Sequence, residues 1–180
     1  MIVLLAEGAV GAATHRQHPY RAHWKQSVVG KRAAARVVAG AVIGQARKHP
    51  RKFGGGAAGF GKRVGAGFAT NAVGRTVEHG IAAKLHEDLH YQRSNKHGVG
   101  PRLAYALKST VVTHNTRTGK ATPAAGRLAG HAAAGAFTQG VLAAGSGAAT
   151  AGIGVAADAG ANVAREFAPR RKPHRNRRMR

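Results

Sequence analysis

The pattern of apolar and polar positions predicts a chain built mostly of helices. Between residues 59 and 91 apolar side chains recur every four residues, so they fall on one face of a helix. Residues 20–49 also suit a helix, because an apolar stripe leaves the other faces to Lys and Arg. The two stripes are Val28, Val29, Val37, Val38, Val42 and Ile43 in the first helix, and Val73, Val77, Ile81, Leu85 and Leu89 in the second.

Proline and glycine predict where these elements begin and end. The His49-Pro50 pair should end the first helix, because the residue before proline is pushed out of the helical region. Pro101 suits the first turn of a short helix that reaches about Val112. The polar stretch after it predicts a short β-hairpin near 110–121. Thr122 and Pro123 then fit the N-cap and first position of the next helix.

Residues 128–157 contain no Lys, Arg, Asp or Glu. A break near residues 145–147 divides this segment into two helices, and we expect the second to reach Phe167. Thirty residues suffice for one tilted membrane span but not for two. We expect a closely packed peripheral or partly inserted helical hairpin rather than a true span.

Small residues recur every fourth position and form ladders on helix faces. Such a ladder lets another helix backbone approach closely, in a membrane or in a tight bundle. The alternative is that a chain rich in Ala and Gly produces these spacings by chance. The candidate packing positions are Gly61, Gly65, Gly126, Gly130, Gly152, Ala156 and Gly160.

Composition and charge narrow the class of protein. The 180 residues include 29 Lys and Arg against 6 Asp and Glu, a formal net charge of +23. High charge with few bulky apolar residues is typical of disordered chains and argues against a large hydrophobic core. The absence of cysteine excludes disulfides, thiolate metal sites and Cys nucleophiles. We expect one helical domain over 20–168, a poorly ordered N-terminus or signal remnant over 1–19, and a disordered basic tail over 169–180.

One motif suggests metal chemistry. His86-Glu87-Asp88-Leu89-His90 reads H-E-x-x-H, which on a helix holds zinc between two histidines while the glutamate polarises a bound water. A zinc hydrolase would use Glu87 for catalysis, with His86, His90 and His79 as ligands. The interpretation we prefer is that Glu87 and Asp88 are counter-charges inside a basic fold. We therefore expect no cofactor and no enzymatic activity.

Several short motifs are spread over residues 60–169. They are Phe60-Gly61-Lys62-Arg63, His86-Glu87-Asp88-Leu89 with Tyr91, Arg93-Ser94, Pro101-Arg102-Leu103 with Tyr105-Ala106-Leu107, and Asn162-Val163-Ala164-Arg165-Glu166-Phe167. On these motifs the chain resembles an uncharacterised family of bacterial proteins that are often rich in Ala and Gly and carry export signals. The resemblance implies association with the cell envelope and supplies no activity. Residues 1–13 depart from the family's export signal.

The sequence favours a non-enzymatic helical protein that associates with the membrane or cell envelope. Its ladders would pack against lipid or a second copy of the chain, and its tail would bind anionic headgroups. The alternative is nucleic-acid binding, since a charge of +23 attracts phosphate. If the N-terminus is complete and is not a signal, we expect a cytoplasmic protein. The cations of the tail are Arg170, Arg171, Lys172, Arg175, Arg177, Arg178 and Arg180.

Overall fold

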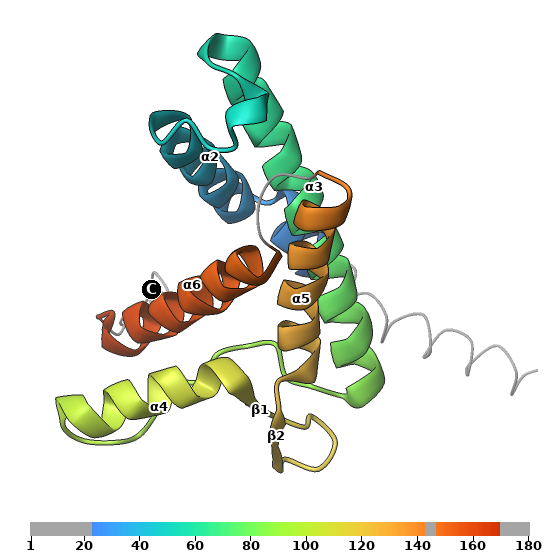
Figure 1. Cartoon of the computed structure of the whole chain (residues 1–180). Coiled ribbons are helices and arrows are strands. Elements are labelled where there is room, and N and C mark those ends of the chain that lie inside the picture. Colours follow the sequence, from blue (N-terminus) through green and yellow to red (C-terminus); the bar gives the residue numbers. More distant parts are fainter. Residues whose placement is uncertain (1–22, 143–146, 170–180) are drawn as a thin grey trace, which may run out of the picture.

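A computed structural model describes residues 23–142 and 147–169, which are mostly helical and include one small hairpin (Figure 1). The mostly helical fold and the hairpin predicted near 110–121 are confirmed. Residues 23–29 are helical and precede the other elements. These are α2 (Lys31–Ala46), the 3-10 turn η1 (Arg51–Phe53), α3 (Gly56–Leu85), α4 (Val99–Val111), β1 (Val112–His114), β2 (Ala121–Pro123), α5 (Ala125–Gly140) and α6 (Gly147–Phe167).

The helices pack as a chain of neighbours around α3 and α5. These two helices lie side by side, and α2 packs on the N-terminal part of α3 (Figure 1). Helix α6 packs on α5, on the same side of the α3–α5 pair as α2, and α4 packs on α6 (Figure 1). The hairpin connects α4 to α5, with β1 antiparallel to β2. This order leaves α2 and α4 as the outer elements, each covered along one side.

Glycine carbonyls and alanine methyls form the contact between α3 and α5. A Cβ atom added at Gly130 would lie 2.7 Å from the carbonyl oxygen of Gly74, and one added at Gly126 would lie 2.8 Å from that of Glu78. No real side chain fits at such distances. The most deeply buried apolar residues of the described chain include Ala82, Ala106 and Ala124, so small residues replace bulky ones in the core.

The other ladder positions have no such neighbours. A Cβ at Gly61, Gly65, Gly152 or Gly160 would meet nothing within 4 Å among the described residues, and Ala156 is exposed. The expectation that these positions pack against another helix is therefore wrong within the described chain. Equal spacing places residues on one face of a helix but does not determine what that face meets. Packing of these positions against a second molecule stays a prediction.

The apolar stripe of the first helix is also largely uncovered. Val38, Val42 and Ile43 are exposed, because α2 turns Ala33 and Ala41 toward the rest of the molecule instead. Small side chains allow α2 to lie close to α3, as in the α3–α5 pair.

Two element boundaries differ from those expected. Helix α3 ends at Leu85 rather than near residue 91, because His86 adopts a left-handed conformation (φ 57°) that terminates the helix. Thr122 and Pro123 are not a helix cap: both belong to β2, where they pair with Thr113 and Val112. Helix α5 begins two residues after Pro123.

The two helices expected around residues 145–147 are present as α5 and α6, and α6 ends at Phe167 as predicted. Among the described residues, every helix is too short or too polar to pass through a bilayer. The expectations for residues 1–19 and for the basic tail concern segments that lie almost wholly outside the described residues, so they stay predictions.

Candidate functional site

The described carboxylates are buried or half-buried, whereas most of the cations are exposed. Fifteen of the 20 Lys and Arg in residues 23–142 and 147–169 are exposed, but all five Asp and Glu in the same ranges are buried or half-buried. Each carboxylate has hydrogen-bond or ion-pair partners within the fold. The acids are therefore paired within the fold, and the exposed side chains that carry a fixed charge in the described residues are all cations.

Glu166, near the end of α6, is the most completely enclosed of these acids. Its Oε1 accepts hydrogen bonds from the Ser94 hydroxyl at 2.6 Å and from Arg102 Nε at 3.1 Å. Its Oε2 accepts from the Tyr91 hydroxyl at 2.7 Å and from the Ser94 backbone N–H at 3.0 Å. Arg93 donates to the carbonyl oxygen of Glu166 at 2.7 Å. This network ties the segment between α3 and α4 to the end of α6.

The same network sets the ionisation of Glu166. Burial by itself raises the pKa of this carboxyl, but the hydrogen bonds from Ser94, Tyr91 and Arg102 outweigh it and lower the pKa to about 2. Burial and the adjacent Glu166 raise the pKa of Tyr91. Glu166 is thus a buried carboxylate that stays ionised at neutral pH.

The H-E-x-x-H pentad is not on a helix, so the prediction that its two histidines share one helix face, as a zinc site would require, is wrong. His86 terminates α3 and its side chain is exposed. Glu87 is buried, and its two oxygens each accept a 3.0 Å hydrogen bond, from the backbone N–H groups of Ala125 and Gly126. The carboxylate therefore caps the N-terminus of α5, where a negative charge also interacts favourably with the helix dipole.

We expect the Glu87→Ala variant to lower the free energy of unfolding by about 1 kcal/mol, the usual cost of losing a helix cap. The matched control is Asp88→Ala, since the Asp88 side chain bonds only to two exposed residues, His90 and Gln92. Urea titration at neutral pH measures the free energy of unfolding of both variants. An equal loss in the two variants would contradict the capping role of Glu87.

Two of the three histidines considered as zinc ligands, His79 and His90, each lie close to His23, which was not among the proposed ligands. His79 Nε2 lies 3.1 Å from His23 Nδ1, and the rings of His23 and His90 have centroids 4.9 Å apart. Burial and the neighbouring His90 and His79 lower the pKa of His23. Within residues 23–142 and 147–169, no group of three His, Asp or Glu side chains is placed to hold a metal ion.

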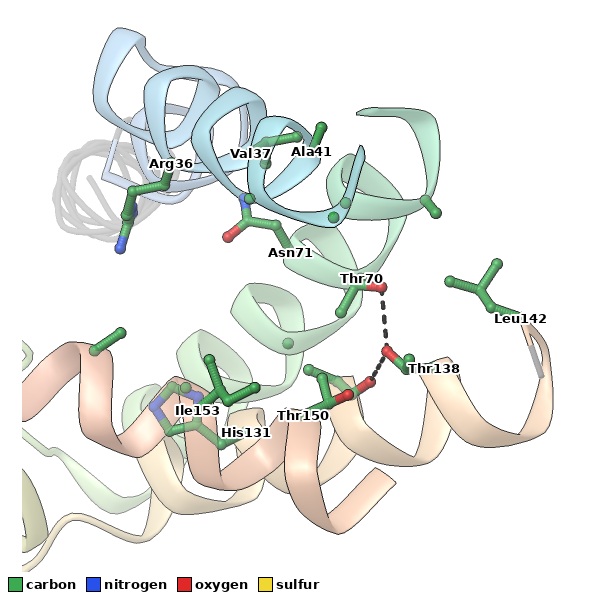
Figure 2. A pocket seen from close by; sticks show the side chains of 18 of the residues that line it. Arg36, Val37, Ala41, Thr70, Asn71, His131, Thr138, Leu142, Thr150 and Ile153 are labelled. Atoms are coloured by element: carbon green, nitrogen blue, oxygen red, sulfur yellow. Dashed lines mark hydrogen bonds between the residues drawn. The ribbon is translucent and has the colours of Figure 1, made fainter. Parts of the chain in front are cut away.

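A cavity of about 400 Å³ opens between α2, α3, α5 and α6 (Figure 2). Asp158 lies at its edge, 2.9 Å from His131 Nε2 and 3.9 Å from Arg127 Nε. Burial raises the pKa of Asp158, but the hydrogen bond from His131 and the nearby Arg75 and Arg127 lower it overall. No residue type or spacing in the sequence marked this cavity, because four separate elements form it.

An exposed apolar stripe runs along α4. Its members are spaced by four residues, so they share one side of the helix, and α6 packs on a neighbouring side, where Ala106 and Thr110 are buried. Figure 1 shows α4 at the edge of the molecule with α6 along one side. The period-four spacing was visible in the sequence. The stripe residues are Val99, Leu103, Leu107 and Val111, all of them exposed.

The structure brings only some of the predicted site residues into contact with other parts of the described chain. Gly126 and Gly130 lie in the α3–α5 contact, Glu87 caps α5, and the cations of the tail, Arg170 to Arg180, lie outside the described residues. Sequence reasoning missed the functional candidates on α4 and in the cavity. Searches against protein-family models, curated proteins and solved structures find no match to this chain, so the resemblance over residues 60–169 stays a prediction.

Proposed function

We propose that the protein is a non-enzymatic helical protein of the cell envelope that binds the surface of an anionic lipid bilayer. The observation that carries the proposal is the separation of charge, because every described carboxylate is buried or half-buried and has partners within the fold, while 15 cations are exposed. Each Lys or Arg close to an anionic bilayer contributes about 1 kcal/mol to binding. The tail adds seven further Lys and Arg in residues 170–180.

The stripe on α4 favours lipid over nucleic acid as the anionic partner. Amphipathic helices bind bilayers by burying an apolar face at the headgroup boundary while nearby cations meet anionic lipids. Val99, Leu103, Leu107 and Val111 provide such a face, and Lys108 is exposed on the same helix. Single-stranded nucleic acids instead stack on aromatic side chains, and this stripe is entirely aliphatic.

The test is cosedimentation of the full chain with vesicles that contain phosphatidylglycerol, compared with vesicles of phosphatidylcholine alone. We expect binding to the anionic vesicles that weakens with salt. The double variant Leu103→Gln with Leu107→Gln should bind roughly tenfold more weakly, because burying one leucine side chain contributes about 1.5–3 kcal/mol and these two are already partly covered.

The matched control is Leu128→Gln on α5, where the leucine is 38% exposed against 39% for Leu103. Circular dichroism verifies that the variants stay folded, and the control should bind vesicles like the unaltered protein. Loss of binding in the control as well as in the α4 variant would contradict the role of the stripe. Tight binding of duplex DNA with no binding of anionic vesicles would favour the nucleic-acid alternative.

A further inference from the structure

The cavity between the four helices has the size and lining of a small-molecule site. Its volume of about 400 Å³ falls in the range of roughly 300–1,000 Å³ that is usual for such sites. The walls are mostly carbon, with Val37 and Ala41 from α2, Leu142 after α5, and Ile153 and Ala157 from α6. Such a space accommodates an alkyl chain, which needs no polar partners.

One end of the cavity has a positive charge that the fold does not neutralise. Arg36 projects from α2 into the space between α2 and α6 (Figure 2). Its only hydrogen bond among the described residues is a 3.4 Å contact from Nε to the Arg32 carbonyl of its own helix. Arg36 is one of the exposed cations. Its partial burial lowers the pKa of the guanidinium, and the nearby Arg75 and Arg165 lower it further, while Asp158 and Glu78 act in the opposite direction.

The acids around Arg36 are already engaged with other groups. Glu78 pairs with Arg75, and Asp158 accepts a hydrogen bond from His131. An external anion beside Arg36 would therefore reduce the repulsion among Arg36, Arg75 and Arg165. A guanidinium is suited to carboxylate and phosphate oxygens, which it can bind through two N–H groups at once.

From the apolar cavity and the unneutralised arginine at its edge, we propose that the protein binds a single-chain anionic amphiphile. The alkyl chain enters the cavity between α2 and α6, and the carboxylate or phosphate head binds Arg36. This site is separate from α4 and does not depend on the bilayer binding proposed above.

Isothermal titration calorimetry of the full chain, without vesicles, tests the proposal with three probes. Decanoate has both the chain and the anionic head, butanoate shares only the head, and decyltrimethylammonium shares only the chain length. We expect decanoate to bind with 1:1 stoichiometry and at least tenfold more tightly than either of the others. Equal binding of decanoate and butanoate, or of decanoate and the cationic probe, would overturn the proposal.

Two pairs of variants locate the ligand. Arg36→Gln should weaken decanoate binding about tenfold, the order expected for one lost charge-assisted hydrogen bond, whereas Arg32→Gln, one turn away and outside the cavity, should not. Ala157→Phe should block the chain, because Ala157 lines the cavity, whereas Ala156→Phe at the adjacent position outside the cavity should leave binding unchanged.

Equal effects within either pair would mean non-specific adsorption and would overturn the site. The Leu103→Gln and Leu107→Gln double variant should bind decanoate normally. Loss of decanoate binding in that variant would place the alkyl chain on α4 rather than in the cavity. Failure of vesicle binding with intact decanoate binding would contradict only the proposed bilayer function.

Discussion

Replacing Glu166 by glutamine is expected to lower the free energy of unfolding by about 3 kcal/mol, the lower end of the cost of breaking a buried ion pair. Glutamine has the same shape but only one acceptor oxygen. Arg102 Nε donates to Oε1 and the Ser94 N–H donates to Oε2, and neither donor can reverse its role. Whichever way the amide is oriented, its NH₂ group faces one of these donors. Urea denaturation at pH 7 measures the loss.

The stability of the unaltered protein and of the Glu166→Gln variant, measured as a function of pH, provides a second test. Because folding lowers the pKa of Glu166 from 4.5 to about 2, its stabilising contribution is complete above pH 4.5 and is lost as the pH falls toward 2. The difference in stability between the unaltered protein and Glu166→Gln should therefore shrink over this interval. A difference that stays constant down to pH 2 would contradict the depressed pKa.

Gly130→Ala is expected to lower the free energy of unfolding by about 2 kcal/mol, within the range for overpacking a close contact. The added methyl group would lie 2.7 Å from the Gly74 carbonyl oxygen and 2.8 Å from Glu78 Cβ. Helices α3 and α5 would have to move apart along their shared length. Thermal and urea unfolding would both report the change.

The matched control is the same substitution where no neighbour lies in the way. Gly152 is in the interior of α6, and a Cβ there would meet nothing within 4 Å among the described residues. Since alanine is favoured over glycine in a helix by about 1 kcal/mol, Gly152→Ala should be neutral or stabilising. Destabilisation of both variants by the same amount would mean that backbone proximity between α3 and α5 is not what distinguishes Gly130.

Local signals predicted most of the fold. Apolar side chains every four residues identified α3, Pro101 placed the start of α4, and the uncharged segment split into α5 and α6. The errors occurred where a distant group decided the local outcome. Thr122 and Pro123 have good capping chemistry, but pairing with β1 took them into the hairpin, and the buried Glu87 capped α5 instead.

The candidate sites were harder to predict, because their members are remote in sequence. Glu166 lies at the C-terminal end of a helix, where the dipole disfavours a negative charge. Its partners Tyr91 and Ser94 precede it by more than 70 residues. Small-residue spacing was informative only in part: Gly126 and Gly130 contact α3, while the same spacing at Gly152 and Gly160 faces open space.

Arg63 of α3 is another residue whose role the sequence did not reveal. The side chain is buried, and its guanidinium donates to the Gln45 side chain and to the carbonyls of His49, Pro50, Gly54 and Gly59. It thereby holds the connection between α2 and α3 without any carboxylate.

This arrangement limits how the α2–α3 connection can diverge in related sequences. Most of the acceptors of Arg63 are backbone carbonyls, which every residue type provides, so an exposed position such as Arg51 is free to change. Gly59 is constrained, because a Cβ there would lie 2.5 Å from the Gly54 carbonyl oxygen. Gly54 and Gly56 are constrained as well, because their φ angles of 74° and 65° favour glycine. A homologue that keeps the arginine and these three glycines should retain the same loop path even when the other side chains of the loop share no identity.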